Sequence, residues 1–190
     1  MDEQIFSALV GFIGAIVGGV LAGGAVIWQT RRMLNAQNVQ READQEREGQ
    51  SIAMALLWEI DDFYKLCIRN VSRALKTAEP AELGFYVKPD SLRSFTVFEA
   101  TAGKIGLFEP ALVQGIVSFY GQAKAYRETL NDYRNAMEQI QAGNRHEYHG
   151  KAVTLLAQIK GSAASFVPFT RTVCEALATR AGANYSFEQP

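Results

Sequence analysis

The stretch IFSALVGFIGAIVGGVLAGGAVIW, residues 5–28, decides where the rest of the chain must lie. It contains no charged side chain, and its only polar residue is Ser7. A helix rises about 1.5 Å per residue, so this stretch reaches roughly 36 Å, and the hydrocarbon core of a bilayer is about 30 Å thick. The sequence therefore predicts an all-α protein with one N-terminal transmembrane helix over residues 5–28.

Two other interpretations of this stretch fit less well. A cleaved signal peptide begins with basic residues and has an apolar run of about 7 to 15 residues. This chain begins with the acidic sequence MDEQ, and its apolar run is longer. A buried helix of a soluble protein ordinarily keeps one polar edge over such a length, and this stretch has none. We therefore expect it to span the membrane.

The charges on either side of the span predict its orientation. Residues 1–4 hold no Lys or Arg, whereas Arg31 and Arg32 closely follow Trp28. Segments rich in Lys and Arg stay in the cytoplasm, so we expect residues 1–4 to form a short external tail. Trp28, Arg31 and Arg32 would then anchor the helix at the cytoplasmic interface.

Small residues recur along the predicted span at helical spacing. One row consists of Gly11, Ala15, Gly19 and Gly23, and the row beside it of Gly14, Gly18 and Ala22. Small side chains at every fourth position let a second helix approach closely, which is how helices associate in lipid. These rows predict packing between copies or against another membrane protein. The alternative is that glycine is simply frequent in membrane helices.

Residues 29–50, QTRRMLNAQNVQREADQEREGQ, are polar and carry charges of both signs. Acidic and basic residues three or four positions apart favour a solvated helix. We expect a charged helical stalk that continues the span, with Gly49 as its weak point. A flexible charged linker is the alternative, because isolated helices are marginal in water.

Residues 51–182 repeat apolar residues at helical spacing and predict a cytoplasmic antiparallel bundle of three to four helices. The first helix covers residues 51–78, with an apolar face made by Ile52, Leu56, Ile60, Phe63, Cys67, Val71 and Leu75. The second covers residues 110–142 and begins with Pro110, a residue favoured in a first turn. The third covers residues 151–181 and contains Pro168, which we expect to kink or split it.

The segments outside these helices are predicted to be less regular. Residues 80–110 hold three of the five prolines and should form an irregular connection. Within it, Phe85–Val87 suits a brief extended piece, and Ser94 or Thr96 can cap a short helix that stops at Gly103. Residues 183–190 are expected to be a tail, from which Tyr185 and Phe187 can fold back.

The charge of the chain argues against a nucleic-acid partner, and its two cysteines are expected to be reduced. The formal net charge is −1 and the isoelectric point is about 6.2, with basic residues spread among acidic ones, so no nucleic-acid partner is expected. Cys67 and Cys174 lie in apolar helical patterns. Because the cytoplasm is reducing, we expect two buried, reduced thiols rather than a disulfide.

No motif for catalysis, metal or cofactor stands out. His146 and His149 have a spacing that suits two metal ligands, but we expect them to be exposed, because no second ligand cluster is visible. Glu59, Asp61 and Asp62 place three carboxylates in one turn, the raw material of acid–base chemistry. Beside an apolar stripe they are expected to be a solvated face. The sequence thus predicts no enzyme and no cofactor.

Several segments together resemble those of uncharacterised bacterial single-pass inner-membrane proteins with a cytoplasmic helical domain. The segments are the glycine-rich span, the charged stalk, ALLWEI at residues 55–60 and FEATAGKIGLFEPALVQGIVSFY at residues 98–120. The resemblance covers most of the chain but its motifs are structural. It implies a bacterial inner membrane and carries no activity that can be transferred.

Three functions remain as hypotheses. The first is a membrane-anchored, self-associating adaptor or scaffold that presents its bundle to a protein partner. The second is an oligomeric pore or membrane-perturbing effector, although the absence of charged residues from residues 5–28 argues against a wet ion pathway. The third is an enzyme of unknown class, for which only the acidic turn and the histidine pair speak.

Overall fold

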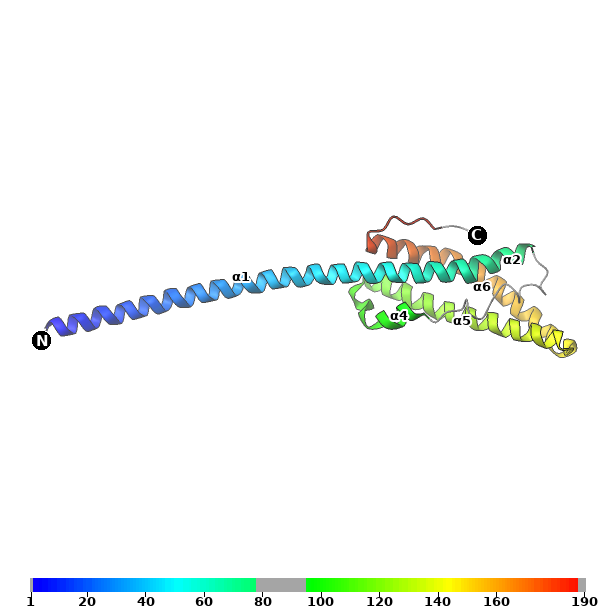
Figure 1. Ribbon diagram of the computed structural model, residues 1–190, viewed down its shortest axis with the longest axis horizontal. Helices are drawn as coiled ribbons and strands as arrows, with labels where there is room; N and C mark the ends of the chain where they lie inside the picture. Colours follow the sequence, from blue (N-terminus) through cyan, green and yellow to red (C-terminus); the bar gives the residue numbers. More distant parts are fainter. Residues whose placement is uncertain (1, 78–94, 188–190) are drawn as a thin grey trace. The chain divides into compact units, whose positions relative to one another are not determined.

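The computed structural model describes residues 2–77 and 95–187, with side chains from residue 28 to 73 and from 95 to 187 (Figure 1). Every regular element in these ranges is a helix, and none of the described residues forms a strand. The all-α prediction is therefore confirmed. The predicted extended piece Phe85–Val87 lies outside the described residues.

The first helix, α1, covers Asp2–Phe63 and so includes the predicted span, the predicted stalk and the first part of the bundle. Contacts divide the chain into two units, Met1–Glu46 and Arg47–Pro190. In the first unit, the described side chains of Trp28, Met33, Leu34 and Val39 are exposed. Residues 29–50 lie within α1 and are helical, not the flexible linker that was the alternative. The rest of the fold is built by the second unit.

Four helical segments besides the end of α1 build the core of the second unit. They are the π-helix η1 (Tyr64–Arg69), α2 (Asn70–Thr77), α5 (Pro110–Gln141) and α6 (Arg145–Ala181). α5 and α6 form an antiparallel hairpin joined through Gly143, whose φ of 100° suits glycine (Figure 1). The core is aromatic at its centre, where the ring centroids of Phe63, Phe119 and Phe166 lie 5.2 to 6.3 Å apart.

The helix predicted over residues 51–78 is interrupted by the π-helical turn η1. The buried residues Ile60, Tyr64 and Ile68 follow one another in steps of four. In an α-helix with 3.6 residues per turn, such steps drift steadily round the axis. The wider π-turn, with its i to i+5 hydrogen bonds, brings them back to the core face. The run of four-residue steps was the sequence signal for this turn.

α5 matches the predicted helix over residues 110–142, with Pro110 in its first turn. α6 begins at Arg145, earlier than predicted, and continues through Pro168 to Ala181. Of the two outcomes predicted at Pro168, a kink or a split, the split is therefore wrong. Pro168 is exposed, whereas Phe166 and Thr170 on either side of it are buried. Their packing holds the helix together across the hydrogen bond that proline cannot make.

The described part of the connection before α5 consists of two short helices, α4 (Thr96–Thr101) and the 3₁₀-helix η3 (Ala102–Leu107). The N-cap of α4 is Phe95, so Thr96 does not cap it as predicted, and Ser94 lies outside the described residues. Gly103 does not end the helical region, because η3 continues past it. Residues 78–94 of the predicted connection lie outside the described residues.

Gly49 is a contact position rather than the weak point that we predicted. It is buried in the second unit, inside α1. A Cβ atom added there would lie 2.7 Å from Nη2 of Arg180, in the last turn of α6. The glycine thus lets the guanidinium lie directly against the backbone of α1, which explains why a poor helix former is placed there.

Candidate functional site

The carboxylate of Glu59 joins three elements. Its two oxygens accept hydrogen bonds from the backbone N–H groups of Val97, at 2.8 Å, and Phe98, at 3.1 Å. The hydroxyl of Tyr120, on α5, donates to the same carboxylate at 2.7 Å. Phe95, the N-cap of α4, offers no side-chain acceptor, so Glu59 on α1 satisfies the N–H groups at the start of α4 in its place. A negative charge there also suits the helix dipole.

Asp61 lies two residues further on and is almost fully buried, with 3% of its surface exposed. One carboxylate oxygen pairs with Nζ of Lys65 at 2.5 Å, and the other accepts a hydrogen bond from the hydroxyl of Tyr185 at 2.7 Å. Asp62 is exposed. The prediction of a solvated acidic face is therefore wrong for Glu59 and Asp61 and confirmed for Asp62. The partners are far away in sequence, so the local pattern did not reveal them.

The chain after α6 turns back along the bundle (Figure 1). Gly182 has a φ of 66°, and the N–H of Ala183 donates to the carbonyl of Ala178 at 2.9 Å, a glycine-based stop for α6. Phe187 then lies with its ring centroid 4.5 Å from that of Tyr64. The predicted tail thus folds back through Tyr185 and Phe187, as their aromatic character allowed.

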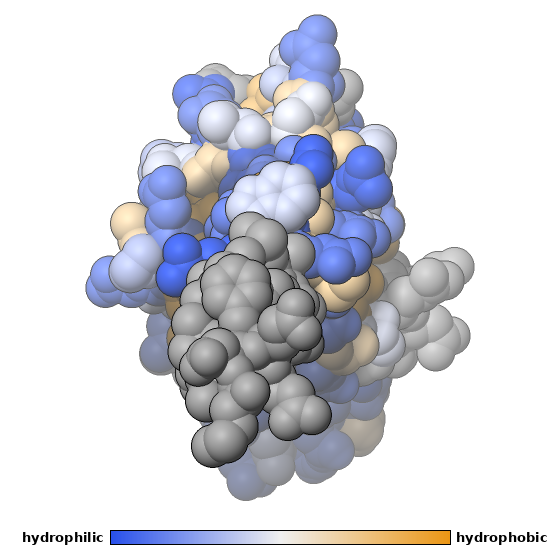
Figure 2. Space-filling model, turned by 90° about the vertical axis from the view of Figure 1, so that its left-hand side faces the viewer, coloured by the Kyte–Doolittle hydropathy of each residue, from blue (hydrophilic) through white to orange (hydrophobic). Residues whose placement is uncertain are grey.

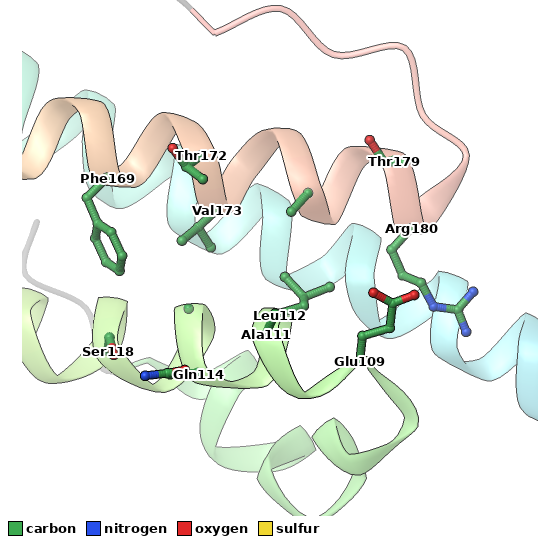
Figure 3. A pocket seen from close by; sticks show the side chains of 12 residues that line it. Glu109, Ala111, Leu112, Gln114, Ser118, Phe169, Thr172, Val173, Thr179 and Arg180 are labelled. Atoms are coloured by element: carbon green, nitrogen blue, oxygen red, sulfur yellow. The ribbon is translucent and has the colours of Figure 1, made fainter.

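An open groove of about 620 Å³ runs between the start of α5 and the end of α6 (Figure 3). Leu112, Phe169 and Val173 contribute apolar surface, and Glu109 and Arg180 stand at one end of it (Figure 3). A Cβ atom added to Gly115 would lie 3.5 Å from Val173, so the two helices are close there. The sequence did not reveal this groove, because helical periodicity does not report how far apart two helices lie.

The face shown in Figure 2 carries no broad apolar patch among the described residues that it colours. There, hydrophilic and hydrophobic side chains of the described residues are interspersed (Figure 2). Single exposed hydrophobic residues elsewhere in the second unit, such as Trp58, Leu66, Val117 and Val153, are ordinary for a protein surface.

The residues predicted to pack in the membrane fall on α1. The side chains of Gly11, Ala15, Gly19, Gly23, Gly14, Gly18 and Ala22 lie outside those that the structure describes. Trp28, Arg31 and Arg32 are described and exposed. The guanidinium of Arg32 lies 5.3 Å from the ring centroid of Trp28, a cation–π contact between two of the predicted anchors.

The two thiols and the two histidines lie in the environments that the sequence predicted. Cys67 and Cys174 are both buried and free. Burial raises the pKa of each thiol to about 12, so both are held protonated and unreactive at neutral pH. His146 and His149 are exposed in the first two turns of α6. No cluster of three metal-binding side chains occurs among the described residues.

Three tyrosines of α5 lie deeper than their spacing alone indicates. Tyr120, Tyr126 and Tyr133 are all buried. Burial raises the pKa of each phenol, and for Tyr120 the hydrogen bond to Glu59 adds to the effect. The hydroxyl of Tyr120 donates to Glu59. The Tyr126 hydroxyl is buried without a hydrogen-bond partner among the described residues.

These raised pKa values predict a loss of stability in alkali. Unfolded Cys and Tyr titrate near pH 9.0 and 10.0, whereas folded Cys67 and Cys174 keep their protons to about pH 12. The folded state therefore binds protons more tightly, and its advantage is complete below pH 9 and lost as the pH rises toward 12. We expect the thermal midpoint, measured by circular dichroism, to fall progressively above pH 9.

A matched control separates the thiols from the phenols. The double variant Cys67→Ala, Cys174→Ala should lose less stability between pH 9 and 10 than the parent chain, because the unfolded thiols titrate at lower pH than the unfolded phenols. Absorbance of tyrosinate at higher pH should appear together with unfolding. A thermal midpoint that is constant from pH 7 to 11 would contradict the prediction.

Comparison of the chain with protein-family models, with curated protein sequences and with solved structures finds no match in any of the three.

Proposed function

We propose that this chain is a membrane-anchored, self-associating adaptor or scaffold that presents its helical bundle to a protein partner. The observation that carries the proposal is the extent of α1, which covers Asp2–Phe63. This one helix contains both the predicted span, residues 5–28, and the buried core residues Ile52, Leu56, Ile60 and Phe63. The anchor and the folded unit are therefore parts of the same element.

The hydrogen bonds and ion pair made by Glu59 and Asp61 support a scaffold rather than an enzyme. In the sequence, Glu59 and Asp61 were the best candidates for acid–base chemistry. In the structure, Glu59 binds two backbone N–H groups and Tyr120, and Asp61 binds Lys65 and Tyr185. Both carboxylates are thus engaged by the protein itself, where they hold elements together.

The membrane segment is assigned to α1 on composition. Among the described residues, α6 (Arg145–Ala181) is also long and apolar enough to cross a membrane, which is weak support for membrane association, since a core helix passes the same test. Ile159, Phe166 and Val173 of α6 are buried in the bundle core. We therefore propose that residues 5–28 span a bacterial inner membrane, with residues 1–4 outside and the bundle in the cytoplasm.

Membrane integration is tested by extraction. The full chain is expected to stay in the membrane pellet after washing with alkaline carbonate, because an uninterrupted apolar helix cannot leave the bilayer without exposing its surface to water. The double variant Val17→Arg, Val20→Arg places two charges in the span, each costing about 2.5 to 3.5 kcal/mol, and should be extracted. Release of the parent chain into the supernatant would refute the assignment.

Self-association is tested at the small-residue rows. Gly19→Ile and Gly23→Ile each place a branched side chain where a neighbouring helix should approach, so the yield of crosslinked oligomer is expected to fall several-fold in membranes. Val20→Ile, outside both rows, is the matched control and should crosslink like the parent chain. Equal crosslinking of all three variants, or a strictly monomeric parent chain, would overturn the self-association.

A further inference from the structure

Residues 183–187 form an extended strap along the bundle. Their exposure alternates, since Ala183, Tyr185 and Phe187 are half-buried whereas Asn184 and Ser186 are exposed. Such alternation is that of an extended chain with one side against the protein. Two aromatic side chains, one residue apart, are thereby directed toward the bundle.

The strap lies over the line where α1 and η1 meet α6. On one side, the hydroxyl of Tyr185 donates to Asp61 at 2.7 Å, and the ring of Phe187 lies 4.5 Å from that of Tyr64. On the other side, the guanidinium of Arg171, on α6, lies 5.6 Å from the ring centroid of Phe187. The strap therefore bridges two walls that come from opposite ends of the second unit's sequence.

Side chains provide the described attachment of the strap. Among residues 183–187, the described hydrogen bonds between backbone groups end with that of Ala183. Beyond it the strap is attached by side chains, through the Tyr185 hydroxyl, the two partners of the Phe187 ring and the packing of both rings against the core. A segment attached in this way can open while the helical core stays folded, because local openings cost less free energy than global unfolding.

Tyr185 of the strap interacts with Cys174, whereas Cys67 interacts with another element. Cys174 is fully buried on α6. Cys67, on η1, is equally buried but interacts electrostatically with Arg127 on α5. The two thiols therefore report on different events. We expect opening of the strap to expose Cys174 alone, and loosening of the core to expose both thiols.

We propose that the surface where α1 and η1 meet α6 is a binding site for an extended segment with the pattern Tyr-x-Phe. The chain's own residues 183–187 occupy this site as a releasable strap. Asp61 binds the tyrosine hydroxyl, while Tyr64 and Arg171 hold the phenylalanine ring between them. The proposal is independent of membrane anchoring, because every contact lies in the second unit.

The first experiment measures how fast each cysteine of the full-length chain is alkylated, with the two sites resolved by mass spectrometry. Phe187→Ala removes both ring contacts, and Tyr185→Phe removes only the hydroxyl, which is bound to a charged group. Each is expected to raise the rate at Cys174 about tenfold or more and to leave Cys67 unchanged. Ser186→Ala, at an exposed position of the same strap, is the matched control and should match the parent.

The second experiment supplies the strap from outside. A peptide GANYSF, equivalent to residues 182–187, is expected to restore the slow alkylation of Cys174 in the Phe187→Ala chain, whereas GANYSA is not. An unchanged Cys174 rate in both strap variants would refute the strap, as would equal acceleration of both cysteines. Acceleration at Cys174 that the peptide GANYSF fails to reverse would refute the binding site for the strap.

Discussion

Glu59→Ala is expected to destabilise the second unit by about 2 to 4 kcal/mol, since hydrogen bonds to charged groups contribute about 1.5 to 3 kcal/mol and partly buried donors are left unpaired. The substitution removes the acceptor for the N–H groups of Val97 and Phe98 and for the hydroxyl of Tyr120. It also removes one negative charge from the start of α4, where Glu99 remains. Equilibrium urea unfolding, followed by circular dichroism, measures the loss.

Two neighbouring substitutions make this prediction specific. Glu59→Gln keeps one carbonyl oxygen as an acceptor and should cost clearly less than Glu59→Ala. Asp62→Ala removes a carboxylate from an exposed position on the same helix and should stay within about 0.5 kcal/mol of the parent chain. If Glu59→Ala and Asp62→Ala cost the same, Glu59 does not hold α4 to the bundle.

Phe119→Ala is expected to destabilise the second unit by about 3 to 5 kcal/mol, the range for truncating a buried aromatic side chain. Phe119 is fully buried, and its ring contacts Phe63 on α1, Phe166 on α6 and its neighbour Tyr120. Removing it leaves a cavity at the point where three helices meet, and surrounding aromatic rings cannot collapse into it without leaving their rotamers.

The control for the core substitution lies two residues away on the same helix. Val117→Ala truncates a side chain that is 48% exposed and should change the free energy of unfolding by less than about 1 kcal/mol. Both variants are compared with the parent by urea unfolding, with the same m-value, the slope of the free energy of unfolding against urea concentration, used for all three chains. A cost below about 1 kcal/mol for Phe119→Ala would mean that α1, α5 and α6 do not meet at this ring.

Helical periodicity predicted most of the helices of the second unit. It predicted few of the contacts that hold these helices together. The apolar steps over residues 110–142 and the proline at the start give α5 almost to the residue, because both are local signals. The cap of α4 was missed, because it comes from Glu59, which lies 38 positions before Val97 in the chain. A local pattern shows that carboxylates flank an apolar stripe but not whether a distant N–H or hydroxyl meets them.

The groove and the strap were beyond the sequence for a related reason. The groove between α5 and α6 depends on the distance between two helices, and residues such as Leu112 and Val173 look like ordinary core positions. The strap depends on Tyr185 reaching Asp61, 124 positions earlier in the chain. The aromatic residues of the tail were the available signal. The membrane span, its orientation and its small-residue rows stay predictions.

The π-turn at Tyr64–Arg69 has a consequence for how this chain can vary in length. A π-turn holds one residue more than the α-turn that it replaces. It therefore takes up one extra residue without changing the direction in which the next helical segment faces. Loss of one residue within it converts the turn to α-helix and leaves α2 facing the same way. At any other point of the same helix, a one-residue deletion rotates every later side chain by about 100°.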